Sequence, residues 1–280
     1  ETSWPTFTPT GTDGRPPVPG DSDYTQSPTG TRHGTHWIPA ECDVPQRPGW
    51  FYHADQDARV KTPNQLFEIY MKSVGRGANM NLGLAPMPDG YLHANDVKSL
   101  KAFGKKLHET FKTNLAQGAS VKVSNLRAQS ARFDGSRILD DDRYSYYASD
   151  DDVHAPELEI TLDGAQEFDL IRLRENIKLG QRLDSVVIET KQDGDWKRLV
   201  SATSIGANRL IKLDKPVRAT QLKIRLFAPV APTLSDFGLF KEFDEPFSFD
   251  TQETERTPLS NEDFDVEAAA QAKSGHAKSE

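Results

Sequence analysis

The chain has 280 residues, of which 36% are hydrophobic, and it carries a net charge of −8 and a single cysteine. This length suffices for two domains of ordinary size. The negative charge argues against a nucleic-acid partner, and no apolar run approaches the ~18 residues that would cross a membrane. Because Cys42 stands alone, the sequence excludes an internal disulfide but leaves the redox compartment open.

The beginning of the chain lacks a regular pattern. Residues 1–35 are rich in Pro, Gly, Thr and Asp and show neither helical nor strand periodicity. A stretch of this length without regular structure is usually a functional loop or a truncated element. Residues 36–53 are dense in aromatic, carboxylate and imidazole side chains. We expect short buried strands flanked by polar groups in that segment.

The next segment, residues 60–115, predicts a helix, a strand and a second helix. Thr62 is a suitable N-cap, a proline follows at the first helical position, and Gln65 completes a capping box. Apolar residues then recur at helical spacing. A strand is expected at residues 78–85 and a helix at residues 96–115. This order is part of an α/β repeat.

After Gly118 the hydrophobic period changes from 3.6 to 2, which predicts β-strands. Asp193-Gly194 is a typical hairpin turn between two of them. Many short strands separated by turn residues favour an antiparallel β-sandwich of about 120 residues. From about Glu245 the periodicity is lost, and we expect a disordered acidic tail. The predicted strands are residues 121–126, 157–162, 168–173, 185–190, 196–200, 209–213, 221–227 and 237–240.

Several segments of the first half resemble the α-L-fucosidases of glycoside hydrolase family 29. They are Pro39–Val44, Arg47–His53 and Leu66–Asn79, followed by an Asp-Val-x-x-Leu helix start at Asp96–Leu100. The segments occur in the order of the family, and the resemblance covers about residues 1–116. The Glu-x-Asp and Pro-Gly-Trp-Phe-Tyr-His patterns look most like the subgroup that cleaves branched α-1,3/1,4-linked fucose.

The second half resembles a discoidin-like, coagulation-factor type C sandwich. The segments that carry this resemblance are Phe168–Ile177, Gly180–Arg182 and Leu222–Arg225. The two resemblances imply an α/β plus all-β fold. In this fold the C-terminal part of a (β/α)8 TIM barrel is followed by an antiparallel β-sandwich of discoidin-like or jelly-roll type. The implied domains are the barrel portion at residues 1–117, the sandwich at 118–243 and the tail at 244–280.

The family resemblance implies a retaining hydrolase, in which an aspartate attacks the anomeric carbon and a glutamate serves as acid and then as base. The family's Trp-Phe-Asp-Gly-like nucleophile motif is absent from this sequence, and its acid/base glutamate aligns a few residues before Glu1–Trp4. We therefore expect both catalytic carboxylates upstream of residue 1 and no hydrolysis by this chain alone. Glu41, beside aromatics and Asp43, is the alternative acid/base, since such surroundings can raise a carboxyl pKa.

Aromatic side chains near residue 50 can line a fucose pocket, because the sugar presents a C6 methyl group and an apolar ring face. Plain core packing is the alternative for these aromatics. The nearby carboxylates and histidines could bind sugar hydroxyls or form buried structural contacts. The candidate substrate-binding residues are Trp50, Phe51, Glu41, Asp43, His36 and His53.

The remaining candidate sites rest on less specific sequence patterns. The aspartate runs at 140–142 and 150–152 could supply oxygen ligands for Ca²⁺, with Asp141 and Asp151 as candidates, although such runs are usually solvated loops. No cofactor and no other metal is expected. The expected partner is a fucosylated glycan, and that substrate favours a secreted or periplasmic location. The alternative function is a non-catalytic carbohydrate-binding sandwich with a barrel remnant.

Overall fold

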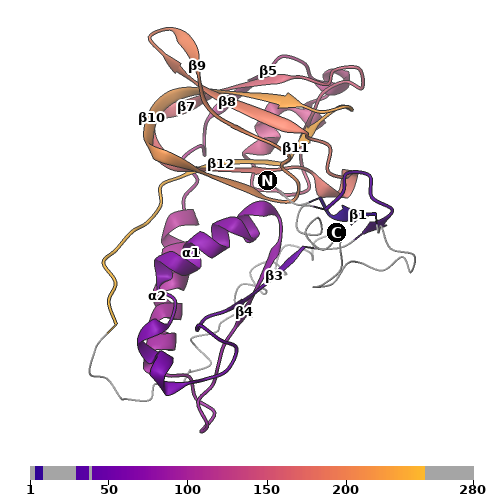
Figure 1. The fold of residues 1–280 in the computed structure, drawn as a ribbon. Coiled ribbons are helices and arrows are strands. Elements are labelled where there is room, and N and C mark those ends of the chain that lie inside the picture. The colour runs from indigo at the N-terminus through magenta and orange to yellow at the C-terminus, as the bar shows by residue number, and fades with distance from the viewer. Residues whose placement is uncertain (1–3, 9–29, 38–39, 250–280) are drawn as a thin grey trace, which may run out of the picture. The chain divides into compact units, whose positions relative to one another are not determined.

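The structure is a computed structural model that describes residues 4–8, 30–37 and 40–249. The chain divides into two compact units, whose helices and strands are labelled in Figure 1. The sheet unit comprises Glu1–Asp43, Phe67–Asn81 and Lys105–Glu245, and the loop unit comprises Val44–Leu66, Leu82–Gly104 and Pro246–Glu280.

Helix α1 (Pro63–Lys72) begins where the sequence predicts. The Gln65 N–H donates to Thr62 Oγ1 at 3.3 Å, and the Thr62 N–H donates to Gln65 Oε1 at 2.9 Å. This reciprocal pair is the predicted capping box, which satisfies two backbone donors that the helix leaves free. Gly77, shortly after the helix, has a φ of +83° that favours glycine.

Helix α2 (Ala94–Phe111) ends four residues before the predicted end at residue 115. The reason is Asn114, whose Oδ1 accepts the backbone N–H groups of Ala116 and Leu239, each at 3.0 Å. Its Nδ2 donates to the Phe237 carbonyl at 3.0 Å. These contacts draw the chain out of the helix toward the sheet, so the apolar spacing alone overestimates the helix length.

The sheet unit contains a six-stranded antiparallel sheet in the order β12-β7-β10-β8-β9, with β5 also paired to β7. A two-stranded antiparallel sheet, β6 with β11, accompanies it. This arrangement confirms the predicted antiparallel, sheet-rich second half. The strands are β5 (Ser120–Val123), β6 (Tyr147–Ala148), β7 (Glu157–Arg174), β8 (Ser185–Gln192), β9 (Asp195–Ala202), β10 (Arg209–Phe227), β11 (Thr233–Leu234) and β12 (Asp236–Phe240).

The two long strands β7 and β10 each join two strands that the sequence predicts as separate. Their pairing continues across register shifts between Lys212 and Val217 and between Ala219 and Gln221. Figure 1 shows β10 curving round the side of the unit. β12 pairs with the second half of β7, whereas β5 pairs with its first half. Turn-like residues at these bends interrupt the alternation, so the pattern suggested loops where the strands bend.

The core of the sheet unit lies among alternating apolar residues of β7, β10 and β12. Leu158, Ile160, Leu222 and Ile224 are fully buried in it. The β8–β9 hairpin turns at Asp193-Gly194, both with positive φ, which confirms the predicted turn.

The structure has two further short strand pairs, in which β1 departs from the sequence expectation. β1 (Thr6–Phe7) pairs antiparallel with β2 (His36–Trp37), although residues 1–35 showed no strand pattern. A pair of two-residue strands is too short to produce a readable period. β3 (Glu41–Pro45) pairs with β4 (Asn79–Gly83), the strand predicted at residues 78–85. Short 3₁₀ turns lie at Ala54–Arg59, Val74–Arg76, Arg127–Gln129, Ala131–Phe133, Gly135–Ile138 and Ile177–Leu179.

The remaining expectations concern the tail and membrane spans. Most of the predicted disordered tail, from residue 250, lies outside the described residues. Neither described α-helix has the length and apolar character that a membrane crossing requires.

Candidate functional site

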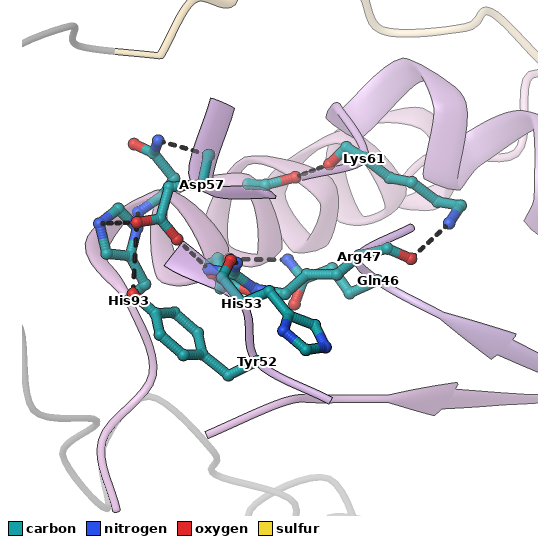
Figure 2. Close-up of polar contacts among 10 residues, drawn as sticks. Gln46, Arg47, Tyr52, His53, Asp57, Lys61 and His93 are labelled. Atoms are coloured by element: carbon teal, nitrogen blue, oxygen red, sulfur yellow. Dashed lines mark hydrogen bonds and ion pairs between the residues drawn. The ribbon is translucent and has the colours of Figure 1, made fainter. Parts of the chain in front are cut away.

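The loop unit is organised around Arg47, a fully buried cation. Its Nε donates to Asp96 Oδ1 at 2.9 Å, and its Nη2 donates to Asp96 Oδ2 at 2.5 Å. Nη2 also reaches Asp57 Oδ1 at 2.9 Å, and Nη1 donates to the His53 carbonyl at 3.2 Å. Figure 2 shows Arg47 extended toward Asp57 and His53. The guanidinium thus joins the start of α2 to the segment that follows β3.

The charges around Arg47 compensate its burial. Burial lowers the pKa of the guanidinium, but the hydrogen bonds and charges of Asp96 and Asp57 outweigh that effect and raise the pKa overall. The Tyr52 ring lies 4.6 Å from the guanidinium, which adds a cation–π contact. Burial and the nearby Asp57 carboxylate raise the pKa of Tyr52. The site therefore keeps Arg47 charged and Tyr52 neutral.

Asp57 connects further groups to this cluster. Its Oδ2 accepts the Tyr52 hydroxyl at 3.3 Å and lies 3.4 Å from His93 Nε2. Its backbone carbonyl accepts Asn95 Nδ2 at 2.9 Å. We call Arg47, Tyr52, Asp57, His93 and Asp96 the arginine clamp.

The backbone beside the clamp is also held by side chains. Lys61 Nζ donates to the carbonyls of Pro45 at 2.6 Å and Arg47 at 3.2 Å. Gln46 Nε2 donates to the Asp96 carbonyl at 2.9 Å. Burial lowers the pKa of Lys61. Residues 45–47 are therefore fixed on both sides, and the loop at residues 48–52 leaves from a rigid base.

That loop exposes two of the predicted sugar-pocket aromatics. Trp50 is 54% exposed and Phe51 is 79% exposed. The Trp50 ring lies against Gly83 of β4, where a Cβ atom would stand 2.9 Å from Trp50 Cζ3. Neither side chain is packed into a core, so the alternative of plain core packing is wrong within this chain.

His53, the third candidate in the loop unit, contributes its backbone carbonyl to Arg47. Its imidazole is exposed. The structure therefore gives His53 a structural role through its main chain and leaves its ring available.

The other three candidates belong to the sheet unit. Glu41 and Asp43 are exposed on β3, so the expectation of buried carboxylate contacts and buried strands is wrong here. Asp43 Oδ1 accepts Asn81 Nδ2 at 2.8 Å, which ties neighbouring strands together. His36 is exposed on β2, and its Nδ1 lies 2.9 Å from Thr35 Oγ1. The face of β3 that carries Glu41 and Asp43 is therefore exposed to solvent.

The calcium candidates lie in loops of the sheet unit. Asp151 forms a two-point contact with Arg127, at 2.6 and 3.1 Å. Asp141 is exposed and has a φ of +59°. Within the described ranges no three His, Cys, Asp or Glu side chains gather as metal ligands would.

Sequence reasoning missed the arginine clamp. Arg47 stands in the segment that carries the family resemblance, but nothing there indicates a buried side chain. Its main partner is Asp96, 49 positions later in the chain. Arginine is rarely buried without a partner, and single-sequence patterns do not identify partners at such distances.

Comparison with known proteins supports both halves of the sequence interpretation. Residues 119–242 match the F5/8 type C domain family. The chain is 34% identical over 227 residues to α-L-fucosidase 1 of Arabidopsis thaliana, a match that covers 80% of this chain and 44% of that protein. The chain therefore spans less than half the length of this relative.

Solved structures give the same result. A Ruminococcus gnavus GH29 fucosidase, crystallised in complex with fucose, superposes with a TM-score of 0.78 at 28% identity and covers 86% of this chain and 48% of that one. A fucosidase from Bacteroides thetaiotaomicron gives a TM-score of 0.76 at 32% identity, over 86% of this chain and 52% of that chain. The homologues of this chain are thus α-L-fucosidases.

Proposed function

We propose that this chain is part of a retaining α-L-fucosidase that removes terminal fucose from glycans. The observation that carries the proposal is the 34% identity to the Arabidopsis α-L-fucosidase over 80% of the chain. The agreement with bacterial fucosidase structures over 86% of the chain supports it. Because the chain spans less than half of the Arabidopsis protein, the activity and the substrate of the whole enzyme belong to this proposal.

In this proposal the nucleophilic aspartate and the acid/base glutamate come from polypeptide upstream of residue 1. Retention needs two carboxyl groups roughly 5 Å apart on either side of the reacting bond. Glu41, the alternative acid/base, is exposed on β3, and its neighbour Asp43 is engaged by the Asn81 amide. This exposure disfavours Glu41 as the acid/base, because catalytic carboxyl groups usually lie in enclosed pockets.

The domain division follows from the same proposal. Residues 1–117 would form the last part of a (β/α)8 barrel, 118–243 an accessory sandwich and 244–280 a tail. The succession of β4 and α2 is that of one βα unit. The match of residues 119–242 to the F5/8 type C family supports the bounds proposed for the sandwich.

The arginine clamp would then position the sugar-binding loop. Arg47 fixes the base of the loop, and Trp50 and Phe51 present large apolar surfaces beyond it. A fucose methyl group and ring face can pack on such aromatics without hydrogen bonds. A rigid base matters because poorly held binding groups lose geometric precision.

An activity assay tests the proposal. The assay offers an aryl α-L-fucoside to two proteins. One is the 280-residue chain, and the other is a longer protein that also contains the polypeptide encoded before residue 1. We expect fucose release from the longer protein and none from the chain alone. Clear turnover by the chain would overturn the upstream placement, and an inactive, well-folded longer protein would overturn the fucosidase assignment.

The linkage preference is tested separately. We propose that the enzyme favours branched glycans with α-1,3/1,4-linked fucose, on the basis of the Glu41–Asp43 and Arg47–His53 patterns. The longer protein should release fucose from a branched glycan with a higher kcat/KM than from an α-1,2-linked disaccharide. Equal kcat/KM values on both substrates would overturn the assignment to the branched-glycan subgroup but not the assignment as an α-L-fucosidase.

The aromatic loop is tested by Trp50→Ala in the longer protein. We expect KM for the fucoside to rise about tenfold with a smaller change in kcat, because ~1.4 kcal/mol of apolar contact would be lost. Tyr91→Ala is the matched control, since Tyr91 is also an exposed aromatic of the loop unit. An unchanged KM in Trp50→Ala would show that Trp50 does not contact the sugar.

A further inference from the structure

The segment that follows β12 has no regular secondary structure, yet each residue from Lys241 to Glu245 contacts a neighbouring element of the sheet unit. It is the orange-yellow trace that leaves β12 in Figure 1. We call residues 241–245 the C-terminal strap. Irregular segments usually run over the surface with their backbone groups in water. The contacts of the C-terminal strap therefore need a separate explanation.

The backbone of the C-terminal strap is satisfied by side chains. The Glu242 N–H donates to Asp169 Oδ1 of β7 at 2.7 Å. The Phe243 N–H donates to Thr110 Oγ1 of α2 at 3.0 Å, and the Phe243 carbonyl accepts Lys106 Nζ at 2.8 Å. These partners replace the strand or helix hydrogen bonds that the segment lacks, so its backbone can be held in one conformation.

Lys106 makes the second half of α2, residues 105–111, dependent on the C-terminal strap. Its side chain is only 4% exposed, and its Nζ lies 2.7 Å from Glu242 Oε1 and 3.6 Å from Asp244 Oδ1. The Phe67 ring, 4.9 Å away, adds a cation–π contact. Within the described residues, both carboxylates that Lys106 contacts thus belong to the strap. A buried ammonium without a carboxylate is strongly disfavoured, so α2 needs the strap in order to bury Lys106.

Glu242 extends this contact to the sheet. Its Oε2 lies 2.8 Å from Lys212 Nζ of β10, and Lys212 Nζ lies 3.0 Å from Glu68 Oε1 of α1. The Glu242 side chain is 15% exposed, so salt should screen its contacts only weakly. One carboxylate thus connects a lysine of α2 with a lysine of the sheet.

The outer end of the C-terminal strap is held differently. Lys105 Nζ lies 2.6 Å from Glu245 Oε2, and both side chains are exposed. Exposed pairs of this kind contribute little to stability and are screened by salt. The inner contacts of Glu242 and Phe243 should therefore hold the segment even where this outer pair is broken.

We propose that the C-terminal strap is a latch that fastens the second half of α2 to the sheet, and that Glu242 closes it by binding Lys106 and Lys212 together. Opening the latch releases residues 105–111 of α2 as a local unfolding unit, whereas β7 and β10 keep the apolar cluster that stabilises them.

The test measures amide hydrogen exchange of the 280-residue chain by two-dimensional NMR. We expect the Glu242 and Phe243 amides to exchange at least about tenfold more slowly than in an unstructured peptide, because side chains accept both N–H groups. This protection should persist in 1 M NaCl, where the screening length falls to ~3 Å. Unprotected amides at these two positions, or loss of their protection in 1 M NaCl, would overturn the proposal.

Two variants open the latch. Lys106→Met removes the ammonium but keeps an apolar side chain of similar length, and Glu242 retains its contact with Lys212. We expect amides of residues 105–111 and 242–243 to exchange about tenfold faster, with β7 and β10 unchanged. Glu242→Ala leaves Lys106 buried without its nearer carboxylate and should have at least this effect.

The matched control is Lys112→Met, the same change at an exposed lysine that pairs with Glu109 and not with the C-terminal strap. It should leave exchange in residues 105–111 and 242–243 unchanged. Unchanged exchange in both latch variants would show that the strap does not hold α2. An equal loss of protection in β7 and β10 would show a general destabilisation and no separate latch. None of these outcomes bears on fucose hydrolysis by the longer protein.

Discussion

Each of the two units of this chain is stabilised internally by a different kind of interaction. The sheet unit surrounds a continuous cluster of apolar side chains from its long strands. The described part of the loop unit buries Gln46, Arg47, Asn95, Asp96 and Ser99 beside a small set of apolar residues. Apolar burial is non-directional, whereas buried charges need exact partners. The loop unit should therefore be the more sensitive of the two to single polar substitutions.

This difference also suits different tasks. The sheet unit gains much of its stability from buried apolar area. The loop unit exposes Trp50 and Phe51 and cannot bury them, so polar contacts at the base must hold the loop in place. Directional polar contacts fix the position of the loop without burying Trp50 and Phe51, whereas apolar packing would cover their rings.

The largest expected effect tests the clamp. Asp96→Ala leaves the Arg47 guanidinium buried without its two-point partner, which typically costs ~3–5 kcal/mol. Hydrogen exchange should show that amides within residues 44–66 lose most of their protection. Amides of β7 and β10 should keep theirs. Equal loss in both regions would mean that the units unfold as one.

The control for this prediction replaces both partners. In the double variant Arg47→Met, Asp96→Leu neither fully buried charge remains, and such replacements are often neutral for stability. Asp57 loses its contact with Arg47, but its carboxylate is partly exposed and keeps its contacts with Tyr52 and His93. We expect protection to return in residues 44–66. If the double variant is as unprotected as Asp96→Ala, side-chain shape and not the unpaired charge explains the loss.

A second prediction addresses the sheet unit. Leu226, on β10, is fully buried in the apolar cluster. Leu226→Ala should lower the free energy of unfolding by about 2–5 kcal/mol, because it removes buried methyl groups and leaves a cavity. Urea unfolding measures the loss. Lys122→Ala, on the exposed face of β5, should stay within ~0.5 kcal/mol.

The sheet unit also buries charged groups, among them Lys106, Glu175 and Asp236. The Glu175 carboxylate accepts backbone N–H groups from Arg182 at 2.6 Å, Leu183 at 2.9 Å and Gly206 at 2.7 Å. Burial nevertheless raises its pKa to about 7, and these hydrogen bonds limit that rise. The folded state thus holds this proton more tightly than the unfolded state, whose ordinary pKa is 4.5.

The stability contribution of Glu175 should therefore depend on pH. It is fully present below pH 4.5 and is lost as the pH rises to about 7. At ~1.4 kcal/mol per pH unit, the loss is roughly 3 kcal/mol at most. Urea unfolding of the chain and of Glu175→Gln at pH 5 and pH 8 measures it. The variant should lose less stability between the two values, and equal losses would contradict the assignment.

The sequence predicted local features of this fold better than distant partners. The capping box at Thr62 and Gln65 and the turn at Asp193-Gly194 depend on neighbouring residues, and both are confirmed. The bends of β7 and β10 were missed because turn residues interrupt their alternation. The pairing of Arg47 with Asp96 depends on chain folding over 49 positions, and no local period records it.

The same limit applies to the candidate site. Trp50 and Phe51 were selected for their chemistry, and the structure leaves both exposed. Buried structural contacts were one alternative for Glu41 and Asp43, but both side chains are exposed on β3. Composition indicates which side chains can do the chemistry, whereas their exposure depends on the elements that surround them. The contact of the sugar with any of these residues stays a prediction.

The smallest expected effect concerns the start of α1. Thr62→Ala removes the hydroxyl that accepts the Gln65 N–H, and the loss of such a cap costs about 1 kcal/mol. Gln65→Ala removes the reciprocal contact to the Thr62 N–H. Because the two contacts share one turn, the double variant should cost less than the sum of the single ones. Thermal unfolding of the four proteins measures this coupling, and strict additivity would mean that the two contacts form independently of each other.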